Sequence, residues 1–296
     1  MVRLIPVLFV VLALFSCKSE KSGIAKIDEL FASFEKSPSP ESATVLQTEI
    51  ETYIAENQND TTGNAALLMR LAMANEKLNR PNEAVQNLRR GLKDFYNTEN
   101  GAEMALALAA LYDKKLQKPT QKTLILQAAR EAFTGNEKIT EAAKALPPDL
   151  PSIHERMSSM GKMVFNDTLQ RFNEKIATDF VTACENIALV LPQDSMSAAY
   201  LIDAATIARN LGSIPKVLEL FQWVYTKFPN HPKAADAMFL EAFTYDSDLK
   251  DLEKAKQGYE SYLAKYPDDD FSDDAKVMLK NLGKSDDEIL KELESQ

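Results

Sequence analysis

The chain of 296 residues has few of the residues that most often build catalytic and metal sites. It contains two histidines, two cysteines and one tryptophan. His154 and His231 are far apart, and neither has a second histidine or a cysteine at the spacing of zinc ligands. No glycine-rich phosphate loop and no G-x-S-x-G motif occurs. We therefore expect a protein that is not an enzyme and that carries no metal ion and no cofactor.

One apparent catalytic motif is explained by chance. Residues Ser159 to Lys162 match S-x-x-K, the nucleophile motif of penicillin-binding enzymes. The same pattern begins at three other serines, and the companion K-T-G motif is absent. A helical toroid enzyme, such as a lyase, would need an acid or base beside an aromatic residue in a cleft, and no residue stands out for that role.

Glycine is also scarce, with nine residues in the chain, which favours helices joined by short turns. Apolar residues recur at helical spacing almost to the C-terminus, and strand-like alternation is hard to find. The sequence therefore predicts an all-α protein. Its formal charge of −10 is unfavourable for contact with phosphate backbones, so we expect no nucleic-acid partner.

Five aspartates lie between residues 268 and 274, around Phe271. A calcium loop of the EF-hand type would need a glycine and a terminal glutamate that are missing here. The preferred interpretation is a set of carboxylates at a helix N-terminus, where the helix dipole favours negative charge. Weak calcium binding at the surface stays open as the alternative.

The N-terminus has the features of a secretion signal. Arg3 precedes an apolar run from Leu4 to Phe15, and Cys17 follows before the sequence turns polar. The run is shorter than the about 20 residues needed to span a bilayer, so it predicts a signal peptide over residues 1–16. An uncleaved anchor with an incidental cysteine is the alternative.

The junction resembles the lipobox of bacterial lipoproteins, with Leu14, Ser16 and Cys17 in the expected places and Phe15 where a smaller residue is usual. The resemblance implies that Cys17 is lipidated and that residues 17–23 form a tether. Lys18 after the cysteine, rather than an aspartate, implies the outer membrane. The other cysteine, Cys184, falls on an apolar helix face and is expected to be buried and inert. We also expect Met157, Met160 and Met163 to fill the core.

An internal repeat organises the C-terminal half. Three segments carry an apolar stripe at positions i, i+4, i+7 and i+11, followed by a proline that ends the helix. The stripe of Val217 to Pro229 recurs 38 residues later and 37 residues earlier. The three sets are Phe180, Cys184, Ile187, Leu191 and Pro192; Val217, Phe221, Val224, Phe228 and Pro229; and Ala255, Tyr259, Tyr262, Tyr266 and Pro267. A helix rich in small residues precedes each stripe, which predicts close antiparallel pairs.

Other signals mark helix starts and a boundary. Ser39-Pro40-Glu41 predicts a helix N-terminus, and capping boxes are predicted at Ser152 and Ser285. The segment 147–151, with three prolines, is the candidate boundary. We expect an N-terminal helical segment over 24–146, with one degenerate repeat at about 63–115. A repeat array over 152–296 would end in a capping helix.

The repeats resemble the tetratricopeptide repeat, in a pattern carried by Leu201, Ala204, Ala205, Val217, Phe221 and Pro229. The following unit departs from it, because Phe243 stands where a small residue is usual. The resemblance implies a solenoid of antiparallel helix pairs whose first helices line a concave face. That face would carry Met69, Met73, Glu76, Ile202, Thr206, Arg209, Leu240 and Thr244.

Taken together, the resemblance implies an interaction scaffold that binds a peptide or partner helix, anchored at the periplasmic face of an outer membrane. Similar proteins are the repeat lipoproteins of the β-barrel assembly machinery and the periplasmic repeat proteins associated with the Tol–Pal system. The alternative is a nutrient- or glycan-binding surface lipoprotein. Its weakness is that Trp223, the one tryptophan, lies on a helix expected to pack in the core.

Overall fold

The computed structural model of the chain describes residues 23–166 and 171–291, except 286 and 289. The expected signal peptide, Cys17 and most of the tether lie outside these residues, as does part of the expected capping helix. The described residues fold into α-helices joined by turns, with one pair of two-residue strands. The predicted all-α class is confirmed. Within the described part of the chain, no helix is both long and apolar enough to cross a bilayer.

The chain divides into two compact units, residues 1–58 and 59–296. The first contains α1 (Gly23–Lys36) and α2 (Pro40–Glu56), which bury Ile27, Phe34 and Ile50. Ser39 caps α2, since its hydroxyl oxygen accepts from the Ser42 N–H at 3.1 Å, and Pro40 occupies the first helical position. The predicted start of this helix is confirmed.

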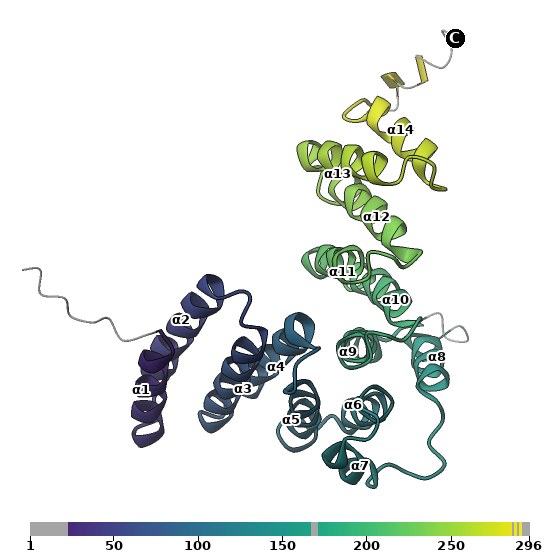
Figure 1. Cartoon of the computed structure of the whole chain (residues 1–296). Coiled ribbons are helices and arrows are strands. Elements are labelled where there is room, and N and C mark those ends of the chain that lie inside the picture. The colour runs from purple at the N-terminus through teal and green to yellow at the C-terminus, as the bar shows by residue number, and fades with distance from the viewer. Residues whose placement is uncertain (1–22, 167–170, 286, 289, 292–296) are drawn as a thin grey trace, which may run out of the picture. The chain divides into compact units, whose positions relative to one another are not determined.

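The second unit holds the remaining elements (Figure 1). Their bounds are α3 (Thr61–Lys77), α4 (Pro81–Phe95), α5 (Gly101–Lys114), α6 (Pro119–Ala132), α7 (Glu137–Ala143), α8 (Ile153–Val164), β1 (Phe165–Asn166), β2 (Arg171–Phe172), α9 (Glu174–Val190), α10 (Ser197–Asn210), α11 (Ile214–Lys227), α12 (Lys233–Ser247), α13 (Leu252–Lys265) and α14 (Ser272–Asn281).

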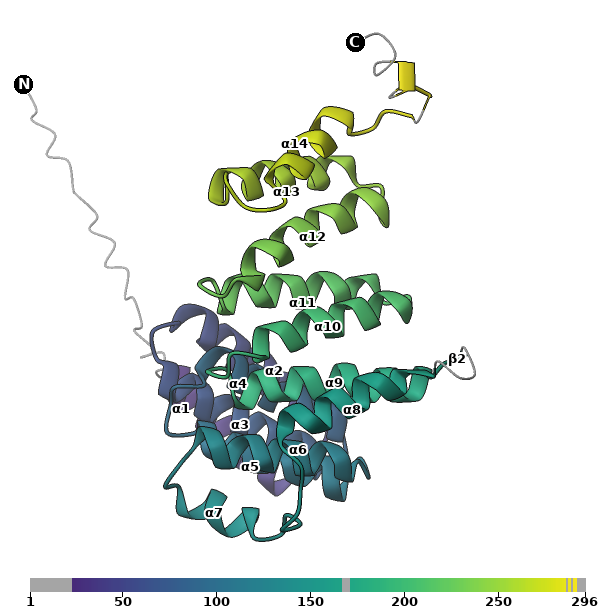
Figure 2. The ribbon, with the colours of Figure 1, turned by 90° about the vertical axis from the view of Figure 1, so that its right-hand side faces the viewer.

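Neighbouring helices in this unit pack as pairs, and each pair packs on the next. Helices α3 and α4, α5 and α6, α10 and α11, and α12 and α13 are in extensive contact, and α4–α5 and α11–α12 join successive pairs. Figure 2 shows α10 to α14 stacked one on another. Because the connecting turns are short, each helix packs antiparallel against the helix before it.

The three predicted stripes are the buried faces of α9, α11 and α13. Ile187, Val224 and Tyr262 occupy the same position of the repeat, and each is fully buried. Each helix ends two residues before the predicted proline, with one C-cap residue between them. At these ends, the N–H groups of Leu191, Phe228 and Tyr266 donate to carbonyls four residues earlier. The predicted periodicity and the predicted helix ends are confirmed.

The division between the two units lies elsewhere than we expected. Residues 147–151 are inside the second unit, and Leu146 and Ile153 on either side of them belong to one buried cluster that runs from Ala65 to Ala237. The Gln127 side-chain amide also donates to the Pro151 carbonyl at 2.9 Å. Prolines interrupt the helices here without interrupting the core.

Two local features also differ from expectation. Phe165 and Phe172 face each other in an antiparallel strand pair between α8 and α9, which the helical periodicity did not indicate. Of the three methionines expected in the core, Met157 is buried, whereas Met163 is half exposed. The predicted burial of Cys184 is confirmed, and burial raises the pKa of its thiol well above the ordinary value.

A close approach of α12 and α13 at Gly258 gives a test of this packing. A Cβ atom at Gly258 would lie 2.7 Å from Ala242 Cβ and 3.1 Å from Ala242 Cα, so the backbone must shift. We expect Gly258→Ala to lower the free energy of unfolding by about 1–3 kcal/mol in urea denaturation. Gly161→Ala is the control, because its Cβ would meet Phe180 at 3.5 Å and a helix interior favours alanine by about 0.5–1 kcal/mol. Equal stabilities would contradict the close packing.

Candidate partner-binding surfaces

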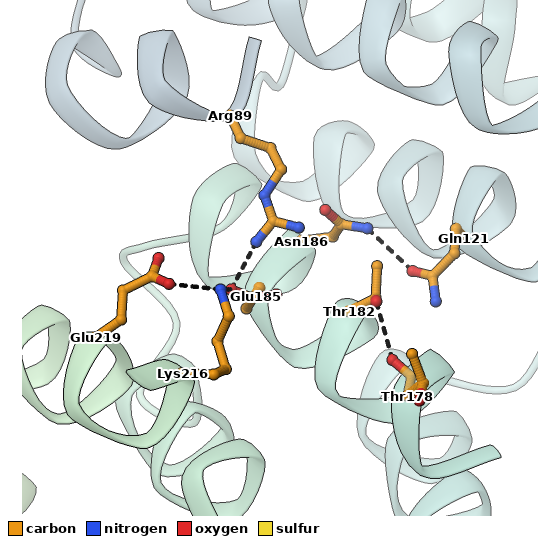
Figure 3. Close-up of polar contacts among 8 residues, drawn as sticks. All are labelled: Arg89, Gln121, Thr178, Thr182, Glu185, Asn186, Lys216 and Glu219. Carbon is orange, nitrogen blue, oxygen red and sulfur yellow. Dashed lines mark hydrogen bonds and ion pairs between the residues drawn. The ribbon is translucent and has the colours of Figure 1, made fainter. Parts of the chain in front are cut away.

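Helix α9 carries a buried carboxylate that joins three helices. The Glu185 side chain is 4% exposed, and its Oε1 lies 2.8 Å from Arg89 Nη2 on α4 and 3.1 Å from Lys216 Nζ on α11. Figure 3 shows the two cations converging on this carboxylate, with Glu219 on the far side of Lys216. Glu219 Oε2 accepts from Lys216 Nζ at 2.5 Å. A charge this deeply buried requires such partners.

The charges in this network stabilise one another. Burial by itself would raise the pKa of Glu185, but Arg89 and Lys216 outweigh it, and the pKa is lowered. The pKa of Arg89 is raised, because the attraction to Glu185 outweighs the burial that would lower it. Glu185 is therefore ionised at neutral pH, and α4, α9 and α11 are held by two charge-assisted contacts.

The next residue of α9 makes a second polar link on another side. Asn186 Nδ2 donates to Gln121 Oε1 on α6 at 3.0 Å (Figure 3). Gln121 Nε2 in turn donates to the Asp179 carbonyl at 2.8 Å. Gln121 and Asn186 are both buried. Thus α9 is joined by side-chain polar contacts to α4, α6 and α11.

A cavity of about 500 Å³ opens beside the Glu185 network, between α4, α9 and α11. We call it the basic cavity. It is lined by Gln86, Arg89, Arg90, Lys93, Asp94, Leu189, Lys216, Glu219 and Trp223. Its four cationic side chains face Asp94 and Glu219, and Glu185 also contacts two of them, so an excess of one positive charge remains in a protein whose formal charge is −10.

A second, smaller depression lies where α3, α4 and α5 meet. We call it the apolar depression. Its volume is about 80 Å³, and it is lined by Met69, Ala72, Met73, Glu76, Leu88, Ala107, Ala110 and Leu111. Met73 is 63% exposed, although it is a large apolar side chain. Three of the residues that the resemblance placed on a binding face, Met69, Met73 and Glu76, thus lie together around one depression.

The other five predicted residues lie in α10 and α12. Thr206 is exposed, while Ile202 and Leu240 are partly buried against the core. Thr244 is fully buried, and this corrects its placement on an open face. Its hydroxyl oxygen accepts from Arg209 Nη2 at 2.6 Å, so Arg209 forms a hydrogen bond between α10 and α12. Helical periodicity places a residue on a face but does not show whether a neighbouring helix covers it.

Arg209 therefore takes part in the packing of the array. Its Nη2 also lies 3.4 Å from Asp248 Oδ2, at the end of α12. Reversing the charge at this residue would disturb the array itself, so a change in binding could not be separated from a change in folding.

The acidic segment and the histidines have structural partners. Asp273 and Asp274 lie in the first turn of α14, as predicted, and Asp269 Oδ1 accepts from the Tyr262 hydroxyl at 2.5 Å. Among the described residues, no three acidic, histidine or cysteine side chains gather as metal ligands would. His154 Nδ1 is 2.5 Å from the Tyr200 hydroxyl, and His231 Nε2 is 2.9 Å from a backbone carbonyl.

Comparison with known proteins adds little. No protein-family model and no curated protein matches the chain. Among solved structures it is similar to the TPR2AB-domain:pHSP90 complex of yeast Sti1, with 14% sequence identity over 88% of this chain and 99% of that chain. The TM-score of this match is 0.30, too low to carry an argument. The assignment of the fold therefore depends on the helix pairs described above.

The Glu185 network generates a prediction about stability and pH. Glu185→Gln leaves Arg89 with no full charge to offset its burial, so we expect the free energy of unfolding to fall by about 3–5 kcal/mol at pH 7. Because the folded-state pKa is lowered, the loss should be complete above the ordinary glutamate pKa of about 4.3 and shrink as pH falls through the lower folded value. Urea denaturation across this pH range measures it.

The matched control is Glu219→Gln, which removes the exposed partner of Lys216. Its side chain is 48% exposed, so we expect a loss below about 1 kcal/mol. Equal effects of the two substitutions at pH 7 would show that burial of Glu185 is not what gives the network its strength.

Proposed function

We propose that this chain is a lipid-anchored interaction scaffold of the bacterial cell envelope, and that the apolar depression binds a helical segment of a partner protein. The observation that carries the proposal is the exposure of Met73 at the rim of an apolar hollow. Contiguous apolar surface is typical of sites that a partner covers, and methionine is frequent at binding surfaces that adapt to their partner.

The size of the depression determines what it can accept. Small-molecule sites usually measure about 300–1,000 Å³, and a volume of about 80 Å³ is far below that range. It fits a single apolar side chain. Because Ala107 and Ala110 are small, the backbone of α5 is open to close approach, and Met69 and Met73 on α3 can fold over an inserted side chain. An amphipathic helix that inserts one apolar anchor meets these conditions.

Glu76 indicates which charge the partner should carry next to its apolar anchor. It lines the same depression and is exposed, so it offers a carboxylate at the edge of an apolar contact. A lysine or arginine next to the apolar anchor of the partner would be favoured there, and an acidic residue disfavoured. Charge at the edge of an interface selects partners more than it adds affinity.

The proposed anchoring is supported by the sequence around Cys17. One acyl chain binds a membrane only marginally, with about 0.8 kcal/mol for each buried CH₂ group. The two or three chains that the lipobox resemblance implies would hold the protein durably at a membrane surface. We propose the outer membrane, facing the periplasm, on account of Lys18.

The glycan-binding alternative has less support. Stacking against a sugar needs an open aromatic face, and Trp223 is only 4% exposed. The Lys93 ammonium also lies 4.4 Å from the centre of the Trp223 ring. We therefore favour a protein partner.

Lipidation is testable by metabolic labelling of cells that express the full chain with an alkyne fatty acid. We expect the wild type to be labelled and to sediment with membranes, and Cys17→Ala to be unlabelled and released, because the thiol is the acylated atom. Cys184→Ala is the control and should keep the label, since that thiol is buried. A wild type without label, or label retained in Cys17→Ala, would contradict the anchor.

The apolar depression is testable by site-specific photo-crosslinking at residue 73 in intact cells. The crosslinked segment is identified, synthesised as a peptide and titrated against the purified chain. We expect a helical peptide with an apolar anchor beside a basic residue, and an affinity that falls about tenfold or more in Met73→Glu, because a carboxylate replaces an apolar contact.

Met163→Glu is the matched control, because Met163 is also exposed but lies on α8, outside the depression. It should bind the peptide like the wild type. A peptide whose affinity is unchanged by Met73→Glu, or reduced equally by both substitutions, would exclude the depression as its site.

A further inference from the structure

A third hollow, of about 400 Å³, lies between α6 and α8, apart from the two surfaces described above. We call it the α8 hollow. Helix α8 packs along α9, whereas its contact with α6 is limited, and the hollow lies on the α6 side. Its lining consists of Thr120, Pro151, Glu155, Arg156, Ser159 and Met160.

Arg156 is the cation of this hollow, and neutral groups of α6 hold its guanidinium. Arg156 Nη1 donates to Gln127 Oε1 at 2.8 Å, and Arg156 Nη2 donates to Thr123 Oγ1 at 2.7 Å. Gln127 is buried, and its own amide donates to the Pro151 carbonyl at 2.9 Å. Because its partners are fixed in this way, the guanidinium is held in place before any ligand arrives.

Arg156 has no counter-charge of its own. Within the described ranges of the chain, no carboxylate forms an ion pair with it, and the pKa of Arg156 is lowered by burial alone. A guanidinium has five N–H donors, and two of these donate to Gln127 and Thr123. Hydrogen bonds between a charged donor and a carboxylate are roughly twice as strong as neutral ones. A partly buried arginine with donors to spare therefore favours an anion beside it.

Glu155 is the other charged residue of the lining, and its carboxylate caps α8. Glu155 Oε2 accepts from the N–H and from the hydroxyl of Ser152, each at 2.9 Å, and these bonds lower the pKa of Glu155. It is ionised at neutral pH, so the lining carries no net charge and disfavours strongly acidic ligands. A phosphate monoester, with about 1.5–2 negative charges, is disfavoured more than a single carboxylate.

We propose that the α8 hollow binds one acidic side chain of a partner protein, with its carboxylate against Arg156 and an apolar neighbour against Met160. The exposed hydroxyls of Thr120 and Ser159 can donate to the same carboxylate. This goes beyond the function proposed above, since the hollow lies between α6 and α8 and does not depend on what fills the apolar depression.

The shape of the hollow favours a protein segment over a free carboxylic acid. A volume of about 400 Å³ is more than one carboxylate fills, which leaves room for the residue beside it. Small-molecule sites usually cover about 70–90% of their ligand. Here Thr120, Pro151 and Ser159 are exposed, so a small acid would stay largely in water. A protein segment can lie across such an open surface and insert one side chain.

The test uses the purified full chain labelled with ¹⁵N and two peptides that differ at one position. Both peptides have an alanine background with one leucine, which is followed by glutamate in the first peptide and by glutamine in the second. The NMR signal of the Arg156 Nε–H group reports binding. We expect this signal to shift to saturation with the glutamate peptide and to stay in place with the glutamine peptide. The signal of Arg130, an exposed residue of α6, is the internal control and should not saturate.

Ser159→Glu tests the hollow while keeping the hydrogen bonds of Arg156 to α6. Residues 156 and 159 lie three apart on α8, so the new carboxylate can pair with the guanidinium in place of the peptide. We expect the affinity for the glutamate peptide to fall at least about tenfold. Ser158→Glu is the matched control, because it adds the same charge at an exposed residue outside the lining and should bind like the wild type.

Four results would overturn the proposal. These are no shift of the Arg156 signal in a wild type whose spectrum shows a folded chain, equal shifts with both peptides, equal saturation at Arg130, and equal weakening by both serine substitutions. A peptide with phosphoserine in place of glutamate that binds about tenfold more tightly would also contradict it, since the hollow would then select phosphate. None of these results bears on crosslinking at residue 73, so the two sites are tested separately.

Discussion

One buried carboxylate joins three helices of the second unit that are distant in the sequence. Glu185 is held by Arg89 from α4 and Lys216 from α11, and these three residues are distant in the sequence. A buried ion contributes little net stability, since desolvation offsets much of the attraction, but a buried ion without its partners is strongly unfavourable. We therefore expect the network to act mainly by disfavouring other arrangements of these helices. A packing of α4, α9 and α11 that separated either cation from the carboxylate would leave a buried charge without its partner.

Both candidate surfaces follow from that constraint. Helix α4 places Leu88 against the apolar depression and Arg89, Arg90 and Lys93 toward the basic cavity. One helix thus separates an apolar surface from a charged one. The contacts of Glu185 with Arg89 and Lys216 join the helices that line the cavity. Helix α4 therefore takes part both in the buried Glu185 network and in the lining of the proposed binding surface.

Much of the fold could be predicted from the sequence, because its main signals are local. Helical periodicity indicated the buried faces of α9, α11 and α13, and prolines indicated where they end. Serines followed by suitable acceptors indicated the caps. Such signals come from neighbours within one or two turns of a helix, and a sequence displays those neighbours directly. The division of the chain was less predictable, because residues 147–151 break helices while the buried core continues past them.

The surfaces could be predicted only in part, because they depend on contacts between distant residues. The resemblance to tetratricopeptide repeats placed Met69, Met73 and Glu76 on one face, and these residues do surround one depression. It also placed Thr244 there, which α10 and its Arg209 cover. The Glu185 network has one signal in the sequence, which is a glutamate inside the apolar run from Phe180 to Leu191. A charged residue in such a run indicates a buried partner, but periodicity does not identify which one.

A double-mutant cycle on Arg89→Met and Glu185→Gln measures this central interaction most directly. The free energies of unfolding of the wild type, both single variants and the double variant give the coupling between the two side chains. We expect a coupling energy of about 1–3 kcal/mol, with the double variant more stable than the sum of the single losses predicts. Additive losses would show that Arg89 and Glu185 stabilise the fold independently, and that α4 is held in place by something other than the buried carboxylate.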